Sequence, residues 1–411
     1  MKKVELLAPA GSYEKAKIAF LYGADAVYCG TSSLSLRTRA DMKNDDLEKT
    51  IKYAKKVGKK VYVTLNIFAW DEKYEEIIEM AKKLEELKPS GVIVADGGVM
   101  EVMKQYAPSV PINVSTQANI VSMHSANFWR NNGAKRMIMA REINKKQLKY
   151  IMENKPEDME IEIFVHGAIC FAFSGRCYLS DFLSCRSANL GECSQSCRWS
   201  YNLYAEEKNN PGELMPIEES EYGTSIFSSK DLCLIKEIPE IIEMGVDSLK
   251  IEGRLKTEYY IASVINAYRN AIDDYEKAPE NYDYTKYLKE IEKVKTRKLT
   301  TFYFNDRTNK DIQDFSGRQY NEDYEFGGKV ISYQEKDKSV IEIKNKLQVG
   351  DEMEIIIPYQ IEPYSFKIEK LWDIDTGEEI SQISPGVKGQ KVIMKLPIAC
   401  EENWILRRKK L

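Results

Sequence analysis

The chain has 411 residues, of which 43% are hydrophobic, and this is enough for one large domain and a second, smaller one. Its 60 basic and 64 acidic residues give a formal charge of -4, which excludes a global positive field that would draw the protein to nucleic acid or anionic lipid. The first residues turn polar too early for a signal peptide, and no run of about 18 apolar residues follows. We therefore expect a cytoplasmic protein without a membrane span.

The first 275 residues repeat one unit, in which a short β-branched strand precedes a turn and an amphipathic helix. Predicted helices include Tyr13–Tyr22, Asp46–Val57, Glu72–Leu87, Lys145–Asn154 and Leu255–Tyr275. Eight strands are predicted, at Val4–Ala8, Ala24–Gly30, Lys60–Ile67, Gly91–Asp96, Ile112–Asn119, Arg136–Arg141, Glu160–Gly167 and Asp247–Arg254.

This alternation over about 250 residues predicts an α/β protein with a (β/α)8 TIM-like barrel. An open, doubly wound sheet is the alternative. It is disfavoured because the turn after the first strand, residues 6–11, contains no G-x-G-x-x-G motif.

Alternation within the strands predicts a polar barrel interior, because the apolar side chains should face the helices. Such an interior needs either a ligand or a self-satisfied hydrogen-bond network, and the residues alone leave both possibilities open. Active sites of this fold lie at the carboxyl ends of the strands. The candidates at these ends are Asn66, Asp96, Gln117, Arg141, Glu142, His166 and Arg254.

Cysteines are crowded into a long excursion after the seventh strand, residues 168–233, which we interpret as an insertion over the barrel mouth. A cytoplasmic chain keeps its thiols reduced, so coordination or redox chemistry is favoured over disulfides. The spacing leaves an iron-sulfur cluster, structural zinc and inert buried thiols open. Five of the eight cysteines lie between residues 170 and 197, and a sixth stands at the end of the excursion: Cys170, Cys177, Cys185, Cys193, Cys197 and Cys233. Cys29 and Cys400 lie in predicted strands as small core residues, and no partner spacing recommends Cys185.

The remaining chain changes character. Residues 276–325 are charged and tyrosine-rich, which predicts a helical and extended connector between the barrel of residues 1–275 and a last domain. Short alternating strands separated by turns predict a small β-barrel over residues 326–411. The chain ends in a basic run, residues 407–410, which is either a solvated terminus or a phosphate contact.

The run from Glu162 to Cys170, followed by residues 174–180, resembles the signature of the collagenase-like peptidase family U32. His166 and Cys170 could suggest a cysteine-protease dyad, but a nucleophilic Cys170 would compete with ligation by the same thiol. The resemblance implies an iron-sulfur hydroxylase more strongly than a peptidase. The most similar members form 5-hydroxyuridine at the tRNA wobble position with prephenate, and others carry a 4Fe-4S cluster and act in pairs. A collagenase-like peptidase and a non-catalytic iron-sulfur partner subunit remain the alternatives.

The resemblance also implies roles for single residues. Cys170, Cys177 and Cys193 match cluster ligands of the family, and the fourth ligand is either Cys197 or Cys233. The expected partners are the tRNA anticodon loop and prephenate, and a protein of the same family is a further candidate. For Arg254, a structural role in which it pairs with Glu252 or Glu162 is the alternative to a catalytic one. The tRNA body would be held by the small β domain, by the basic run from Arg407, and by Lys295, Arg297 and Lys298. Catalytic roles are expected for Arg141, Glu162, His166 and Arg254, and substrate binding for Asn66, Gln117 and Glu252.

Overall fold

The computed structural model describes residues 3–31, 33–36, 41–170, 172–199, 201, 203–206, 208, 211–212, 214–217, 229–305, 312, 323–333, 338–386 and 389–410. The chain forms two compact units. The first comprises residues 1–13, 25–255 and 297–320, and the second comprises residues 14–24, 256–296 and 321–411. The domain boundaries expected at residues 275 and 325 divide the chain into consecutive segments. The second unit instead also contains two helices, within residues 14–24 and 256–296, that were expected to belong to the barrel.

The first unit contains a closed barrel of eight parallel strands, as the sequence predicts. The strands pair in the order β12-β1-β2-β4-β5-β6-β7-β8, and a parallel pairing of β12 with β8 closes the ring. The barrel strands are β1 (Glu5–Pro9), β2 (Ala26–Thr31), β4 (Lys60–Leu65), β5 (Gly91–Val94), β6 (Ile112–Val114), β7 (Ala134–Ile138), β8 (Glu160–Ala168) and β12 (Ser248–Ile251). Three further strands extend this sheet: β3 (Asp41–Met42), β11 (Asp231–Cys233) and β13 (Leu299–Thr300).

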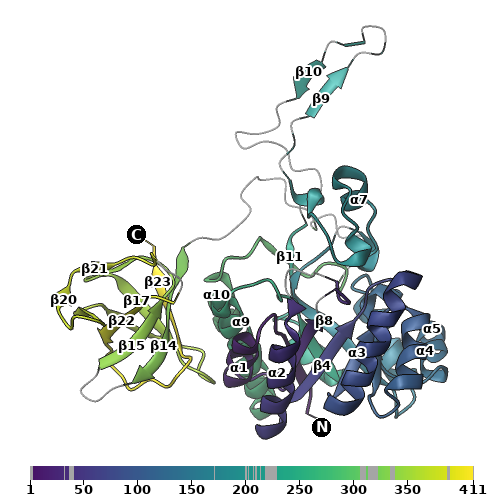
Figure 1. Cartoon of the computed structure of the whole chain (residues 1–411), viewed down its shortest axis with the longest axis horizontal. Helices are drawn as coiled ribbons and strands as arrows, with labels where there is room; N and C mark the ends of the chain where they lie inside the picture. Colours follow the sequence, from purple (N-terminus) through teal and green to yellow (C-terminus); the bar gives the residue numbers. More distant parts are fainter. Residues whose placement is uncertain are drawn as a thin grey trace. The chain divides into compact units, whose positions relative to one another are not determined.

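Amphipathic helices surround these strands, and Figure 1 shows several of them on the outside of the barrel. Helix α2 illustrates why, because its buried residues Leu47, Ile51 and Ala54 recur at helical spacing on one face. The helices of this unit are α2 (Asn44–Lys56), α3 (Tyr74–Leu87), α4 (Gly97–Tyr106), α5 (Met123–Asn131), α6 (Lys145–Asn154), α7 (Leu179–Ser184) and α8 (Ile238–Glu243). Short 3-10 turns are η2 (Asp71–Lys73), η3 (Thr116–Ala118), η4 (Phe173–Gly175), η5 (Ala188–Leu190) and η6 (Ser196–Arg198).

The predicted fifth strand is shorter than expected. It ends at Val114, and η3 follows, because the Ser115 side chain accepts a hydrogen bond from the N–H of Gln117 and caps this turn. Asn119 then takes a left-handed conformation with φ of 56°. The polar residues assigned to the end of this strand therefore lie on a turn at the barrel mouth.

A buried ion network fills the amino-terminal half of the barrel. Arg136 of β7 lies 2.6 Å from Glu5 of β1 and 3.0 Å from Glu162 of β8, and it also pairs with Glu160 at 2.7 Å. Lys250 of β12 lies 2.8 Å from the other oxygen of Glu162. In this half of the barrel the buried charged groups therefore pair with one another. This is the self-satisfied hydrogen-bond network that was one of the two possibilities for a polar interior.

The second unit is an antiparallel sheet domain with helices α1 (Tyr13–Leu21), α9 (Glu258–Lys277) and α10 (Thr285–Glu292) and the turn η7 (Pro279–Asn281). Its described strands pair along the path β18-β17-β23-β14-β15-β22-β19-β20, and β16 pairs with β21. The strands are β14 (Tyr324–Tyr333), β15 (Lys338–Ile343), β16 (Leu347–Gln348), β17 (Glu352–Ile356), β18 (Tyr364–Lys367), β19 (Leu371–Asp373), β20 (Glu379–Ile380), β21 (Gln382–Ile383), β22 (Lys391–Lys395) and β23 (Ile405–Lys409).

The basic C-terminal run is not a solvated tail. Most of it belongs to β23, which lies between β14 and β17 in the sheet. Arg407 is fully buried and pairs with Glu290 and Glu354, and Arg408 lies 3.1 Å from Asp351. The expected phosphate contact by Arg407 is therefore wrong, because its charge is already neutralised inside the unit.

Arg297 is likewise unsuited to the tRNA contact expected of it. It is buried in the first unit and lies 2.6 Å from Asp231. Lys295 and Lys298 are exposed. Among the described residues, no helix combines the length and apolar character needed to cross a membrane.

Candidate functional site

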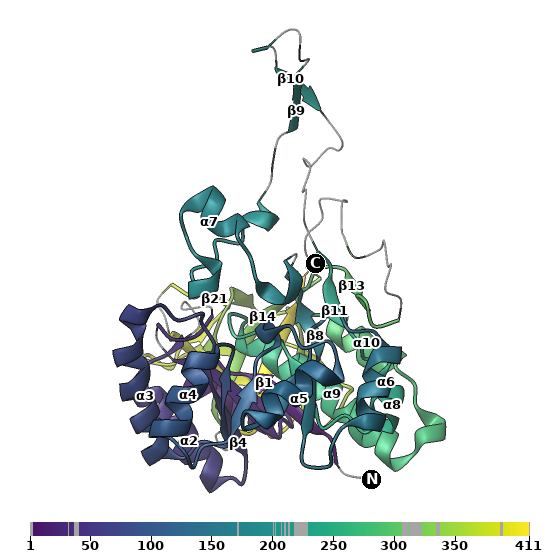
Figure 2. The ribbon, with the colours of Figure 1, turned by 90° about the vertical axis from the view of Figure 1, so that its right-hand side faces the viewer.

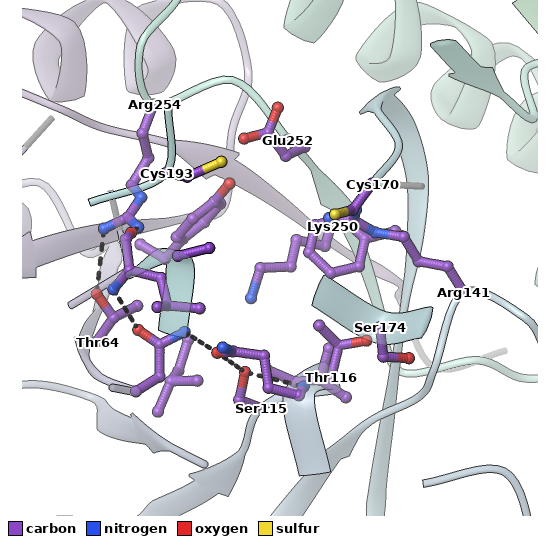
Figure 3. A pocket seen from close by; sticks show the side chains of 18 of the residues that line it. Thr64, Ser115, Thr116, Arg141, Cys170, Ser174, Cys193, Lys250, Glu252 and Arg254 are labelled. Atoms are coloured by element: carbon purple, nitrogen blue, oxygen red, sulfur yellow. Dashed lines mark hydrogen bonds between the residues drawn. The ribbon is translucent and has the colours of Figure 1, made fainter. Parts of the chain in front are cut away.

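A pocket of about 140 Å³ lies at the carboxyl ends of the barrel strands (Figure 3). Its walls combine apolar side chains with a small number of polar and charged groups, as ligand sites usually do. Figure 3 shows Cys170, Cys193 and Glu252 on one side, Ser115 and Thr116 on the other, and Lys250 between them. The lining residues include Tyr28, Thr64, Asn66, Ile93, Ser115, Thr116, Gln117, Ile138, Arg141, Phe164, Cys170, Ser174, Cys177, Cys193, Lys250, Glu252 and Arg254.

Two arginines predicted from the sequence line this pocket. Arg254 is buried and donates hydrogen bonds to the hydroxyls of Ser35 and Thr64, each at 3.2 Å, and to the carbonyl of Leu36. Arg141 donates to the Ala168 carbonyl at 3.2 Å, and its guanidinium lies 4.0 Å from the centre of the Phe164 ring. Hydrogen bonds and ring stacking of this kind fix the orientation of each guanidinium.

Lys250 lines the pocket but was not among the candidates at the strand ends. Figure 3 shows its side chain in the middle of the pocket, and its ammonium lies 4.4 Å from the Tyr28 ring centre and 2.8 Å from Glu162. Burial lowers the pKa of Lys250, the Glu162 carboxylate opposes that shift, and the charges of Arg136 and Arg254 lower the pKa further. The alternation of Lys250, Glu252 and Arg254 along one strand was the signal that could have selected it.

Two predicted amides meet at the pocket wall. Asn66 donates to the side-chain oxygen of Gln117 at 2.6 Å and accepts from the Leu36 N–H at 3.2 Å. Ser115 also donates to that Gln117 oxygen, at 3.2 Å. Within the described part of the chain, Nε2 of Gln117 is buried without a hydrogen-bond partner. The Gln117 amide is therefore oriented by its oxygen and leaves an N–H donor for a ligand.

The cysteine-bearing excursion is fixed to the barrel mouth by polar contacts. Glu142 accepts hydrogen bonds from the N–H and hydroxyl of Ser174, both at 2.7 Å. Arg176 donates to the Gln117 carbonyl at 2.9 Å, and Arg198 donates to the Ile169 carbonyl at 3.2 Å. Figure 2 shows α7 on the side of the barrel where this excursion lies. These bonds hold the segment in place even though much of its apolar surface is exposed.

Three of the predicted ligand thiols, those of Cys170, Cys177 and Cys193, line the pocket at this mouth. Cys197 lies on η6, and its neighbour Arg198 donates a hydrogen bond to the carbonyl of Ile169, the residue before Cys170. The turn that carries Cys197 is therefore held against the segment that carries Cys170. Burial raises the pKa of Cys197, and the positive charge of Arg198 opposes that shift.

Cys233 has different surroundings. It is buried in β11, where its backbone pairs with His166 of β8, and Cys185 is exposed at the end of α7. Among the described residues, no three His, Cys, Asp or Glu side chains lie close enough to hold a single metal ion. A cubane cluster distributes its four thiolates over four irons and so accepts wider spacing than one ion does. The donor set of Cys170, Cys177, Cys193 and Cys197 therefore fits a 4Fe-4S cluster in its chemistry.

Two of the predicted catalytic residues lie outside the pocket lining. Glu162 is fully buried in the ion network beneath it. His166 is buried next to a register shift between β8 and β12, where its carbonyl accepts from the Glu252 N–H at 2.9 Å. Gly167 follows with φ of 110°, and a Cβ there would lie 2.5 Å from the Glu252 carbonyl oxygen. Only glycine permits that close approach of the two strands.

Asp96, another strand-end candidate, has a structural role. Its carboxylate accepts from the N–H groups of Gly98 and Val99, at 2.8 Å and 3.1 Å, and caps α4.

The model of peptidase family U32 matches residues 11–314, and the model of the U32 C-terminal domain matches residues 322–407. The chain belongs to peptidase family U32. The resemblance seen in the sequence is thereby confirmed, and the two matches agree with a barrel followed by a separate antiparallel sheet domain.

Several curated proteins are similar to this chain over most of its length. The tRNA hydroxylation protein P1 of Bacillus subtilis is 40% identical and aligns with 92% of this chain and 89% of its own length. The tRNA hydroxylation protein P of Escherichia coli is 35% identical, with 99% and 96% covered. The 23S rRNA 5-hydroxycytidine C2501 synthase of Escherichia coli is 31% identical, with 87% of this chain and 53% of that protein covered.

Proposed function

We propose that this protein is an RNA hydroxylase whose substrate is tRNA, forming 5-hydroxyuridine at the anticodon wobble position with prephenate as donor. The similarity to proteins named for tRNA hydroxylation supports the tRNA substrate, and the similarity to an rRNA hydroxycytidine synthase supports pyrimidine hydroxylation. The observation that carries the proposal is a pocket bordered both by cysteine thiols and by fixed cationic side chains. Because tRNA is the substrate, the proposal also locates the reaction in the cytoplasm.

The cluster is part of the same proposal. Cys170, Cys177, Cys193 and Cys197 would hold a 4Fe-4S cluster, which would supply redox chemistry when bound. The contact of Arg198 with the Ile169 carbonyl, which ties the turn of Cys197 to the segment of Cys170, supports this set over one containing Cys233, which is buried in β11. The polar contacts from Glu142 and Arg198 would keep the ligands on a fixed segment.

The charge of the pocket supports a small anionic ligand. Arg141, Lys250 and Arg254 line it against one carboxylate, Glu252. Prephenate carries two carboxylates on a six-membered ring, and guanidinium groups match carboxylates with paired hydrogen bonds. Apolar side chains such as Ile93 and Ile138 line the same pocket and would face the ring. Arg141 and Arg254 would thus bind the carboxylates, with Lys250 adding a third positive charge.

The amides would orient the reacting group. The Nε2 donor of Gln117 would bind a ligand oxygen, because its own oxygen is already occupied by Asn66 and Ser115. A wobble uridine in an anticodon loop is unpaired, so its base edge is accessible to such a donor.

The test of the function is mass spectrometry of wobble nucleosides in tRNA from cells that lack the gene. We expect 5-hydroxyuridine and nucleosides derived from it to disappear and to return when the gene is restored. Unchanged nucleosides together with cleavage of denatured collagen by the purified protein would favour the peptidase. An iron-sulfur protein that restores nothing alone but does so with a second U32 protein would be a partner subunit.

Arg254 offers a specific test of the anion-binding role. Changing Arg254→Met should raise the KM for the acidic co-substrate by about 100-fold, because a paired charged hydrogen bond contributes several kcal/mol when buried. Arg254→Lys keeps the charge but loses the fork, and we expect an intermediate KM. The matched control is Arg130→Met, which removes an exposed arginine that pairs with Asp158 at 2.9 Å. An unchanged KM in a folded Arg254→Met protein would show that Arg254 only supports the structure.

A further inference from the structure

The cysteine-bearing excursion exposes a group of aromatic rings that neither the barrel core nor the thiol site requires. Phe173, Tyr178, Phe182 and Trp199, here called the rim aromatics, have exposed fractions of 53%, 73%, 71% and 43%. Isolated exposed apolar residues are normal on a protein surface, but several large rings on one short segment indicate a binding surface. They are therefore candidates for contact with a partner.

These rings lie beside the pocket along the chain. Phe173 precedes Ser174 and Tyr178 follows Cys177, and both neighbours line the pocket. Tyr178, the N-cap residue of α7, and Phe182 of α7 are one helical turn apart, with ring centroids 6.5 Å apart and planes inclined by 35°. Figure 2 shows that α7, which is part of the excursion, lies beyond one end of the barrel. A molecule that inserts one group into the pocket would lay its remaining parts against this rim.

The rings are not needed to hold the excursion in place. Hydrogen bonds made by Glu142, Arg176 and Arg198 hold the excursion against the barrel. An exposed Tyr178 or Phe182 side chain adds little to stability, since most of its surface stays in water. Large exposed rings at such positions therefore point to a ligand rather than to folding.

The size of the pocket and the local charge identify the kind of ligand. At about 140 Å³, the pocket is smaller than the roughly 300–1,000 Å³ typical of sites for drug-sized molecules, so most of a macromolecular substrate has to bind outside it. Residues 170–199 carry three arginines, Arg176, Arg186 and Arg198, against two acidic residues, Asp181 and Glu192, while the whole chain carries -4. An RNA loop fits both features, because its backbone is anionic and its unpaired bases stack on aromatic side chains.

We propose that the rim aromatics form a stacking platform for the unpaired nucleotides that flank the target base, with Tyr178 and Phe182 as its centre. This inference rests on the proposed RNA substrate and adds where the loop is held. Stacking tolerates any base, so the platform would bind the loop without reading its sequence, and selection of the target base would fall to the pocket.

The test measures the affinity of the full-length protein for a fluorescein-labelled RNA hairpin with an anticodon stem and loop. The double variant Tyr178→Ala/Phe182→Ala should bind about 10-fold or more weakly, because each stacked base contributes strongly to affinity. The slope of affinity against salt concentration should stay unchanged, since no phosphate contact is lost. Tyr178→Phe should bind like the wild type. Tyr150→Ala, which removes a 61% exposed ring on α6, is the matched control and should also leave affinity unchanged.

A leucine pair separates stacking from apolar docking. Tyr178→Leu/Phe182→Leu keeps apolar surface but removes the rings, so it should lose affinity as the alanine pair does. Wild-type affinity in the leucine pair would overturn the inference in favour of a protein-docking surface, as would wild-type affinity in the alanine pair. Thermal unfolding of each variant checks that the fold is kept. Failure of the proposed function would instead show as unchanged wobble nucleosides in cells that lack the gene.

Discussion

Replacing Cys177 with serine should yield a folded protein that has lost at least about 90% of its iron and its hydroxylation activity, because a cubane needs all four thiolates for stable binding. The same result is expected for Cys170→Ser, Cys193→Ser and Cys197→Ser. Iron content and visible absorbance after purification without air are the measurements, followed by wobble nucleosides in complemented cells. Serine preserves the size of the side chain, so a loss of iron reports on ligation and not on packing.

The excursion provides its own control for this series. Cys185 is exposed at the end of α7, and Cys185→Ser should retain iron and activity. Cys233→Ser tests the fourth ligand, because Cys233 lies in β11 beside β8. Full iron in Cys233→Ser and loss in Cys197→Ser would support the proposed set. The reverse pattern would show that β11 supplies the fourth thiolate, and iron-free wild-type protein would remove the cluster from the proposal.

Changing Arg136→Met should destabilise the barrel by about 3–5 kcal/mol, the usual consequence of removing one partner from a buried ion network. Arg136 is almost completely buried and pairs with Glu5, Glu160 and Glu162. Without Arg136, the buried carboxylates of Glu5 and Glu162 lose a positively charged partner. The free energy of unfolding in urea measures the effect. Arg130→Met, which breaks an exposed pair, should leave the urea midpoint unchanged.

The same network predicts how the stability of the wild type depends on pH. Burial raises the pKa of Glu5, but Arg136 and Lys60 outweigh this and lower the pKa from 4.5 to about 2. The folded-state pKa is therefore depressed. Stability from Glu5 is complete above pH 4.5 and is lost as the pH falls toward 2, because the unfolded chain takes up a proton first. We expect the difference between wild type and Arg136→Met to shrink over that interval, and a constant difference would contradict the assigned coupling.

Much of the candidate site could be predicted from position in the strands. Seven residues were selected because they lie at carboxyl ends of predicted barrel strands. Four of them line the pocket: Asn66, Gln117, Arg141 and Arg254. The other three, Asp96, Glu142 and His166, are not part of its lining. Alternation alone could not separate the pocket from the network below it. Glu162 and Lys250 face the same interior, yet only Lys250 lines the pocket, because depth along a closed barrel depends on strand stagger.

The sequence by itself determined the barrel, since eight repeats of strand and helix with apolar outer faces have few other ways to bury their surface. It also located the cysteine-bearing excursion, because crowded thiols are evident without a structure. Only the tertiary structure decided which charges are already paired. Arg407 and Arg297 read as free basic residues along the chain, but Glu354 and Asp231 neutralise them, and those partners are 53 and 66 residues away. Such pairings depend on which distant segments come together in the folded chain, and the local sequence pattern around each arginine does not contain that information.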